Sequence, residues 1–222
     1  MYPLKRLTIL CGHYGSGKTN VAVNIATELK KLRDTVTVAD LDIVNPYFRT
    51  KDSAAYFEDR GIRLICSAYA NSNVDIPALP QEMYALTDDR SMTAVLDIGG
   101  DDRGALVLGR LAPKILAEGD YEMLMVINRY RPLTRDAAST MEVMAEIELA
   151  GGIRFTGLIN NSNLGELTTA EDILASREYA EEISRLSGLP LVMTSVRADL
   201  APAVDGRMPH VFPLELQKNK YL

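Results

Sequence analysis

A glycine-rich segment near the start of the chain has the residue types and spacing of a phosphate-binding loop. The segment reads LCGHYGSGKTN, and within it Gly12, Gly17, Lys18 and Thr19 satisfy the pattern GxxxxGK(S/T). Successive N–H groups that surround an anion require positive φ angles and leave no room for Cβ atoms, which accounts for the further glycine, Gly15. The sequence therefore predicts a nucleotide-binding loop of the Walker A type.

Each part of this loop has an expected role toward the phosphates of a nucleotide. Lys18 is predicted to contact the β- and γ-phosphates, and the Thr19 hydroxyl is predicted to bind Mg²⁺. The N-terminus of the helix that follows adds a partial positive charge. The loop residues predicted to bind the nucleotide are Gly12, Gly15, Ser16, Gly17, Lys18 and Thr19.

Acidic residues follow two apolar segments farther along the chain. Asp40 and Asp42 lie in VADLDIVNPYF, and Asp97 begins the sequence DIGG. Acidic groups that face phosphates repel them unless a cation lies between, so we expect Asp97 to hold Mg²⁺ through a coordinated water. With Lys18, Asp42 is the candidate catalytic residue, because it can position and polarise an attacking water, while Asp40 is a structural helper. The DIGG segment also fits a DxxG switch, in which the amide of Gly100 senses a γ-phosphate.

The elements that must position these residues alternate along the chain. Nearly continuous apolar runs predict strands buried on both faces, at 6–11, 35–41, 62–66, 93–98, 121–128, 155–160 and 189–195. Segments of helical period lie between them, at 18–32, 104–117, 135–149 and 168–187, and a surface excursion at 71–89 carries a short helix. Strand–helix alternation of this kind predicts a three-layer α/β/α, doubly wound, mainly parallel sheet. No linker or repeat divides the chain, so one domain over residues 1–222 is expected.

Composition and charge limit the function classes. The chain has 24% charged and 47% hydrophobic residues, as ordinary globular proteins do. Its net charge of −6 argues against binding nucleic acid through bulk electrostatics. No signal peptide and no apolar run of membrane-spanning length is present, and Cys11 and Cys66 are expected to be reduced core thiols. We therefore expect a cytoplasmic protein that does not bind membranes.

The order of the motifs resembles a known group of proteins. A phosphate-binding loop after the first strand, DLD at the second, DIGG at the fourth and GLINN late in the chain are similar to the MinD/ParA/CobQ-like P-loop ATPases of the SIMIBI class. The resemblance covers about the whole chain and implies Mg·ATP binding, slow hydrolysis and an ATP-dependent homodimer. It makes Asp42 the switch I aspartate and Asp97 the switch II aspartate. It also matches Asn160 to the asparagine that contacts the adenine edge, a contact for which an amide has both a donor and an acceptor.

One position departs from this pattern. Regulatory members of the group carry a signature lysine directly after the first glycine of the loop, where this chain has His13. Histidine is shorter and mostly neutral at pH 7, so it cannot supply the same charge to a partner subunit's nucleotide. Arg49, Arg129 and Arg131 are alternative sources of positive charge, although each also fits an ordinary surface position.

Three functions remain open from the sequence. The first is an ATPase with slow turnover whose bound nucleotide switches a dimer or partner interface, for which the aromatic segment NPYFRTKD is a candidate contact surface. The second resembles dethiobiotin synthetase and is a small-molecule kinase or ATP-dependent ligase, with Arg49, Lys51 and Arg103 as candidate substrate contacts. The third is a module that binds ATP without consuming it. Guanine is disfavoured because INNSN stands where a guanine-binding NKxD motif is expected.

Overall fold

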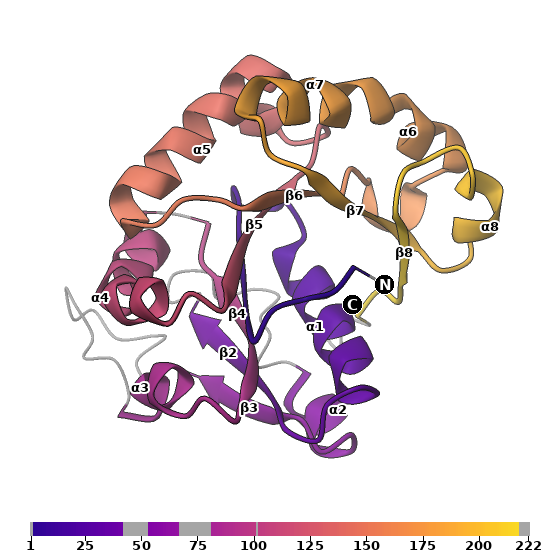
Figure 1. Ribbon diagram of the computed structural model, residues 1–222. Coiled ribbons are helices and arrows are strands. Elements are labelled where there is room, and N and C mark those ends of the chain that lie inside the picture. Colours follow the sequence, from indigo (N-terminus) through magenta and orange to yellow (C-terminus); the bar gives the residue numbers. More distant parts are fainter. Residues whose placement is uncertain (1, 42–52, 67–80, 101, 218–222) are drawn as a thin grey trace.

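One parallel sheet organises the molecule. The computed structural model describes residues 2–41, 53–66, 81–100 and 102–217. Within them, the strands form an eight-stranded sheet in the order β3-β2-β4-β1-β5-β6-β7-β8, and all neighbours run parallel (Figure 1). The strands are β1 (Leu7–Cys11), β2 (Val36–Leu41), β3 (Arg63–Cys66), β4 (Thr93–Ile98), β5 (Tyr121–Ile127), β6 (Gly157–Asn160), β7 (Leu191–Arg197) and β8 (Val211–Leu214).

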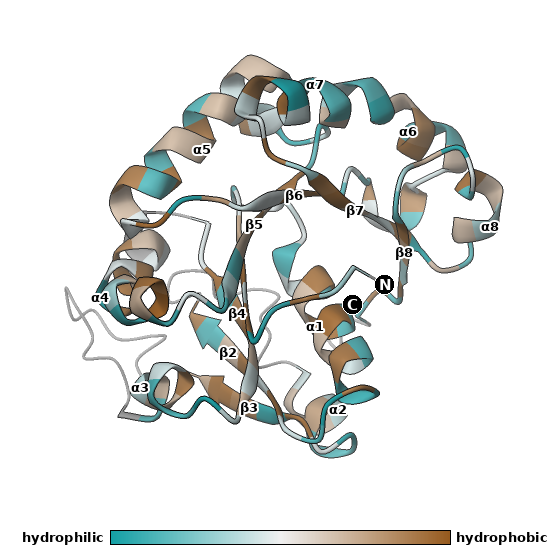
Figure 2. Cartoon of the chain, viewed as in Figure 1, coloured by the Kyte–Doolittle hydropathy of each residue, from teal (hydrophilic) through white to brown (hydrophobic). Residues whose placement is uncertain are grey.

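Helices cover both faces of this sheet, so the structure is the three-layer α/β/α arrangement that the sequence predicts. Figure 2 shows hydrophilic and hydrophobic residues interleaved along α7, as expected for a helix with one face on the core. The α-helices are α1 (Lys18–Lys30), α2 (Ala54–Glu58), α3 (Gln81–Asp88), α4 (Asp102–Glu118), α5 (Ala137–Gly151), α6 (Ala170–Ala175), α7 (Arg177–Ser187) and α8 (Ala201–Val204). Two 3₁₀ turns are η2 (Pro132–Thr134) and η3 (Gly165–Leu167).

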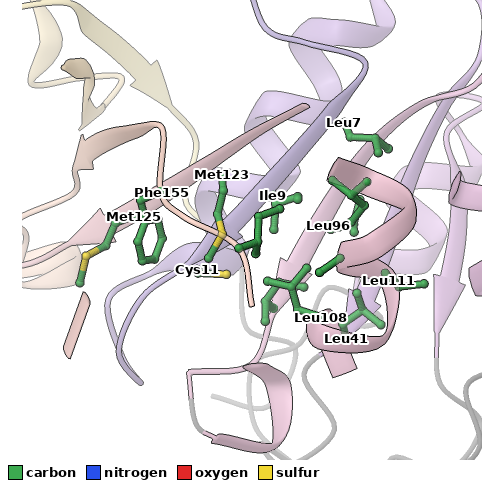
Figure 3. Close-up of a cluster of buried hydrophobic side chains, with 14 of the residues drawn as sticks. Leu7, Ile9, Cys11, Leu41, Leu96, Leu108, Leu111, Met123, Met125 and Phe155 are labelled. Atoms are coloured by element: carbon green, nitrogen blue, oxygen red, sulfur yellow. The ribbon is translucent and has the colours of Figure 1, made fainter. Parts of the chain in front are cut away.

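Side chains of the central strands alternate between two buried clusters. Leu7, Ile9 and Cys11 of β1 belong to the cluster under α3, α4, α5 and α7, part of which is drawn in Figure 3. Leu10 instead packs with Val21 and other residues of α1 on the opposite face. Because both faces are covered, these strands need apolar residues at almost every position. This requirement explains why the strands were readable as continuous apolar runs.

The sheet order brings three strand ends together beside the glycine loop. β1 is central, with β4 on one side and β5 on the other. Leu10 lies opposite Asp97 of β4, and Cys11 lies opposite Met125 of β5. The loop between β1 and α1 therefore opens at the carboxyl edge of the sheet, where open α/β sheets bind their ligands.

Most of the predicted elements are present. Each of the seven predicted strands begins and ends within two residues of an observed strand. The segment 168–187 is divided, because α6 ends at Ser176, whose hydroxyl donates to the Ile173 carbonyl at 2.6 Å. The elements α2, α8 and β8 were not predicted. β8 contains Pro213, which lacks a backbone donor and is tolerated because β8 is an edge strand.

The two cysteines differ in their surroundings. Cys11 is buried in the core, and burial raises the pKa of its thiol well above the ordinary value, so the protonated form persists at neutral pH. Cys66, at the end of β3, is only half-buried. The expectation of a core thiol therefore holds for Cys11 but not fully for Cys66.

Glu122 is a buried carboxyl at the start of β5, at the edge of the sheet opposite the glycine loop. Its Oε1 accepts hydrogen bonds from the Lys5 N–H and the Thr8 hydroxyl, both at 3.0 Å. Its Oε2 has no hydrogen-bond partner among the described residues. Burial raises the pKa of Glu122, because the charged form loses hydration that these two bonds do not replace.

We predict that Glu122 makes the stability of the protein fall as the pH rises toward neutrality. Since the folded-state pKa is above the unfolded value of about 4.3, its stabilising contribution is complete below that value and is lost as the pH rises through the folded pKa. Urea unfolding of the wild type and Glu122→Gln over this range measures the effect. The variant should gain stability relative to the wild type as the pH rises, and a difference that does not change with pH would contradict the prediction.

Candidate functional site

The glycine loop has the backbone geometry that a phosphate cradle requires. Gly12 has φ 148° and Gly17 has φ 87°, both in the region that residues with a Cβ rarely adopt. A Cβ at Gly12 would lie 2.4 Å from the Val126 carbonyl oxygen, and one at Gly17 would lie 2.3 Å from the Asn161 amide nitrogen. The two glycines are therefore fixed by both conformation and space.

Polar groups in this loop are open to an anion. Gly17 caps α1 without any side-chain hydrogen bond, and the first turn of this 13-residue helix has no acidic residue. Among the described residues, no acceptor is bonded to the N–H groups of Gly15 or Gly17. The buried Ser16 hydroxyl likewise has no partner in the described part of the chain. Together with the helix N-terminus, these donors fit a polyphosphate.

Lys18 is buried against the loop and carries charge that described residues do not neutralise. Its Nζ donates to the carbonyls of Gly12 at 3.0 Å and His13 at 3.2 Å. An ammonium group has three donors, so one N–H is available for a phosphate oxygen. Within residues 2–41, 53–66, 81–100 and 102–217, no carboxylate forms an ion pair with Lys18.

Thr19 and Asp97 meet as the sequence analysis requires for a shared metal site. The Thr19 hydroxyl donates to Asp97 Oδ2 at 2.8 Å, and Asp97 is only 1% exposed. Asp40 of β2 lies opposite Asp97 in the strand register and is also buried. A hydroxyl and a carboxylate are suitable oxygen ligands for Mg²⁺. The described residues contain no group of three or more His, Cys, Asp or Glu that could hold a metal ion by itself. Thr19 and Asp97 are the pair that would hold Mg²⁺ together with the nucleotide.

The segment after β4 packs directly on the glycine loop. A Cβ at Gly100 would lie 2.5 Å from the Tyr14 nitrogen and 2.9 Å from the Gly12 carbonyl oxygen. A Cβ at Gly104 would lie 2.6 Å from the carbonyl oxygen of Gly99 in the same segment. Because backbone meets backbone here, a displacement of the loop must be transmitted to the predicted switch segment.

A pocket lies beside the loop, between α1, the segment after β6, and the ends of β7 and β8. Asn161 connects the two regions, because its amide nitrogen donates to the Ser16 carbonyl at 2.7 Å and its Oδ1 accepts from the Ser195 hydroxyl at 2.7 Å. The pocket adjoins the glycine loop and the start of α1 through Gly17 and Asn20. Its lining residues are Gly17, Asn20, Asn161, Ser162, Asn163, Gly165, Thr168, Ile173, Ser195, Val196, Arg197, Leu214 and Leu216.

Asn160 lies behind this pocket and does not line it. Its side chain is fully buried, donates to the Ser176 hydroxyl at 2.8 Å and accepts from the Ser162 N–H at 3.2 Å. An adenine contact through Asn160 would have to replace these bonds. That contact stays a prediction, and in this structure Asn161 and Asn163 are the asparagines of the INNSN segment that reach the pocket.

We predict that Asn161→Ala uncouples the pocket from the loop. The change leaves the Ser16 carbonyl without its amide donor, a loss that costs about 1–3 kcal/mol. The Ser195 hydroxyl loses its 2.7 Å bond to Asn161 Oδ1 but keeps the Asn160 carbonyl as an acceptor at 3.3 Å, so it adds less. Urea unfolding should show a total loss of about 1–3 kcal/mol. Asn163→Ala is the matched control, because among the described residues its amide bonds within its own loop, to the Asn161 carbonyl and the Gly165 N–H. Equal losses in the two variants would contradict the coupling.

Several of the predicted residues lie outside the described part of the chain. These include the candidate water-positioning residue Asp42 and the basic residues Arg49 and Lys51. His13, at the position of the signature lysine, has its Nδ1 3.0 Å from the Tyr14 carbonyl oxygen. Arg131, one of the proposed alternative cations, does reach the loop, because its Nε donates to the Gly15 carbonyl at 2.7 Å.

The C-terminal segment is a part of the site that sequence reasoning missed. After β8 it runs beside α1, where Asn24 forms two hydrogen bonds with the backbone of Glu215, each 2.9 Å long. Two residues later, Gln217 donates its N–H to Asn20 Oδ1 at 2.9 Å. Asn20 directly follows Thr19 in the sequence. The two asparagines at i and i+4 of α1 were the available signal, because such polar residues on one face of a helix often bind passing backbone.

Comparison with known proteins identifies the fold. Sequence comparison finds no matching family model and no matching curated protein. Similar solved structures include FtsY, described as a cell division protein, from Thermotoga maritima, with TM-score 0.57 and 19% identity. They also include FtsY from Mycoplasma mycoides, with a TM-score of 0.56 and 17% identity. A third is the signal recognition particle receptor FtsY from Elizabethkingia anophelis in complex with GDP, with a TM-score of 0.51 and 14% identity. The fold is that of a P-loop NTPase.

The matches cover most of this chain but only part of each FtsY chain. They cover 87%, 88% and 86% of this chain but 63%, 62% and 56% of the three FtsY chains, so this chain spans about three fifths of their length. They show the fold alone and do not distinguish the MinD/ParA/CobQ-like group from other proteins of this fold. None of the described helices has the length and apolar character needed to cross a membrane.

Proposed function

We propose that this chain binds Mg·ATP, hydrolyses it slowly and acts as a nucleotide-controlled regulatory or assembly switch. The observation that carries this proposal is the loop between β1 and α1, where two N–H groups have no acceptor and Lys18 has no ion-pair partner among the described residues. The Thr19–Asp97 pair beside it fits the metal that accompanies a nucleoside triphosphate. When bound, Mg²⁺ would neutralise phosphate charge, while Lys18 orients the terminal phosphates.

The preference for ATP over GTP rests on the segment after β6. One of the similar structures is an FtsY in complex with GDP, so guanine is the competing base. In this chain INNSN covers the last two residues of β6 and the three residues that follow, and it has no aspartate to accept from the two N–H groups of a guanine edge. The proposal therefore assigns adenine to the pocket beside Gly17 and Asn161.

The switch part of the proposal rests on the contact between Gly100 and the loop. Phosphates that bind the loop amides also meet the segment that packs on Tyr14 and Gly12. In this proposal Asp42 positions the attacking water. Two large apolar side chains near the site are exposed: Tyr14 on the loop is 57% exposed, and Leu133, two residues after Arg131, is 54% exposed. They support a protein contact beside the nucleotide, and the proposed partner is a second copy of this chain.

Titration calorimetry with Mg·ATP and Mg·GTP tests the nucleotide assignment. We expect ATP to bind and GTP to bind at least tenfold more weakly. Light scattering with ATP, ADP or neither then tests the switch, and a dimer is expected with ATP alone. Tighter GTP binding would overturn the base assignment. Rapid ATP hydrolysis with water alone would overturn the switch function. ADP release that requires one metabolite would favour a small-molecule kinase or ligase over the switch.

A further inference from the structure

We infer that Arg131 is a second phosphate-binding cation of this site, supplied by the same chain and directed at the terminal phosphates of the nucleotide. This inference rests on the proposed function, since it assigns a further residue to the same loop. Arg131 follows β5 and contacts the loop at Gly15, 116 positions away in the sequence.

The guanidinium of Arg131 lies directly against the loop backbone. Its Nε donates to the Gly15 carbonyl at 2.7 Å. A Cβ at Gly15 would lie 3.4 Å from Arg131 Nε and 3.9 Å from Cζ. The arginine side chain therefore packs against Gly15 from Cδ to Cζ, so its guanidinium lies at the loop that is expected to surround the phosphates.

Most of the binding capacity of this guanidinium is unused. Nε is bonded, but in the described part of the chain neither terminal nitrogen of Arg131 has a hydrogen-bond acceptor, and no carboxylate forms an ion pair with it. Four N–H donors and a full positive charge thus remain available. Guanidinium groups bind phosphate oxygens in pairs, and such charge-assisted bonds are about twice as strong as neutral ones.

The turn that carries Arg131 is held in place before any ligand binds. The buried Asn128 accepts the Tyr130 N–H on its Oδ1 at 3.0 Å and the Arg131 N–H on its carbonyl at 3.1 Å. The Thr134 hydroxyl donates to that same carbonyl at 2.8 Å. Little conformational entropy is lost when a residue on such a fixed turn contacts a ligand.

The positions of the two cations explain how the loop functions without a signature lysine. Lys18 is bonded to the carbonyls of Gly12 and His13, and Arg131 is bonded to that of Gly15. The loop carbonyls are therefore bonded by a cation from the helix that follows the loop and by a cation from the turn after β5. At the position of the signature lysine, His13 has its Nδ1 3.0 Å from the Tyr14 carbonyl oxygen, within the loop. Arg131 provides this charge from within one chain, so it does not depend on a partner subunit.

The number of phosphates on the nucleotide provides a test of the Arg131 contact. ATP carries more negative charge than ADP, so loss of Arg131 should weaken ATP more. Titration calorimetry with Mg·ATP and Mg·ADP on the wild type, Arg131→Ala, Arg131→Lys and Arg135→Ala tests this difference. Arg135 is the matched control, because it lies four residues away, is 76% exposed and contacts its own neighbour Asp136.

We expect Arg131→Ala to weaken ATP binding by about tenfold or more and ADP binding by clearly less. Arg131→Lys should regain part of the loss, and Arg135→Ala should stay within about twofold of the wild type. Thermal unfolding without nucleotide verifies that the variants fold. If Arg131→Ala does not fold, Arg131→Gln replaces it in the same titrations. A folded variant with unchanged ATP affinity, or equal losses for ATP and ADP, would overturn the inference and leave Arg131 as a support for Gly15. A wild type that binds neither nucleotide would instead refute the proposed function.

Discussion

Replacing Lys18 with alanine is expected to reduce the affinity for Mg·ATP by at least about a hundredfold. Lys18 is buried against the loop, its charge is not neutralised by any described carboxylate, and one of its donors is available. A charged hydrogen bond contributes about 1.5–3 kcal/mol, and the buried positive charge beside the phosphates is lost together with that bond. Titration calorimetry measures the loss directly.

The control for this prediction is Lys31→Ala on the same helical segment. Lys31 is largely exposed and pairs with Glu28 three residues earlier, at the opposite end of α1 from the loop. Its loss removes the same charge without touching the site, so ATP affinity should be unchanged within about twofold. Thermal unfolding of Lys18→Ala without nucleotide separates a binding defect from a folding defect. Unchanged ATP affinity in a folded Lys18→Ala variant would mean that the loop is not the nucleotide site.

Local sequence patterns were sufficient for the sheet and the loop because both are determined by local rules. Strands covered on both faces must be apolar throughout, so β4 was predicted at its observed bounds, 93–98. The loop glycines were identified by their spacing before Lys18. Thr19 and Asp97 were both predicted to bind one Mg²⁺ at the carboxyl edge of the sheet, and the pairing of β1 with β4 is consistent with the hydrogen bond between them.

The sequence could not show that Asn161 lines the pocket while Asn160 is buried behind it. Neighbouring residues of a strand point to opposite faces, so one asparagine must face the loop and the other the helices behind it. Which of the two does so depends on how β6 is turned in the sheet, where Leu158 packs in the cluster under α3, α4, α5 and α7 and Ile159 packs in the cluster with α1. Alternation then turns Asn160 toward the helices of the first cluster and Asn161 toward the loop, and an apolar run that is covered on both faces does not reveal which face is which.

Long-range polar contacts were also beyond sequence reasoning. Asn24 and Glu215 are 191 positions apart, and their two hydrogen bonds fix the C-terminal segment against α1. Hydrophobic periodicity carries no information about such a pair. The same holds for Arg131, whose type suggested a cation for the site, although only the fold places its Nε on Gly15.

Substituting alanine for Gly12 should be the most destabilising single methyl addition in the loop. The new Cβ would lie 2.4 Å from the Val126 carbonyl oxygen and 3.3 Å from Ser16 Oγ. Val126 belongs to β5, which pairs with β1 on a register that joins Cys11 to Met125, so its carbonyl cannot move without disturbing the sheet. Overpacking of this kind and a φ of 148° for a residue with a Cβ together cost about 3–5 kcal/mol.

The appropriate control separates backbone strain from steric overlap. Gly119 also has a positive φ, 75°, but a Cβ there would meet no atom within 4 Å. Gly119→Ala should therefore cost only the conformational penalty, about 1–2 kcal/mol. Urea unfolding of the two variants gives the overlap at Gly12 as the difference between them. If Gly12→Ala cost no more than Gly119→Ala, β1 and β5 would have to yield at that point, and the loop could not be a rigid cradle set by the sheet.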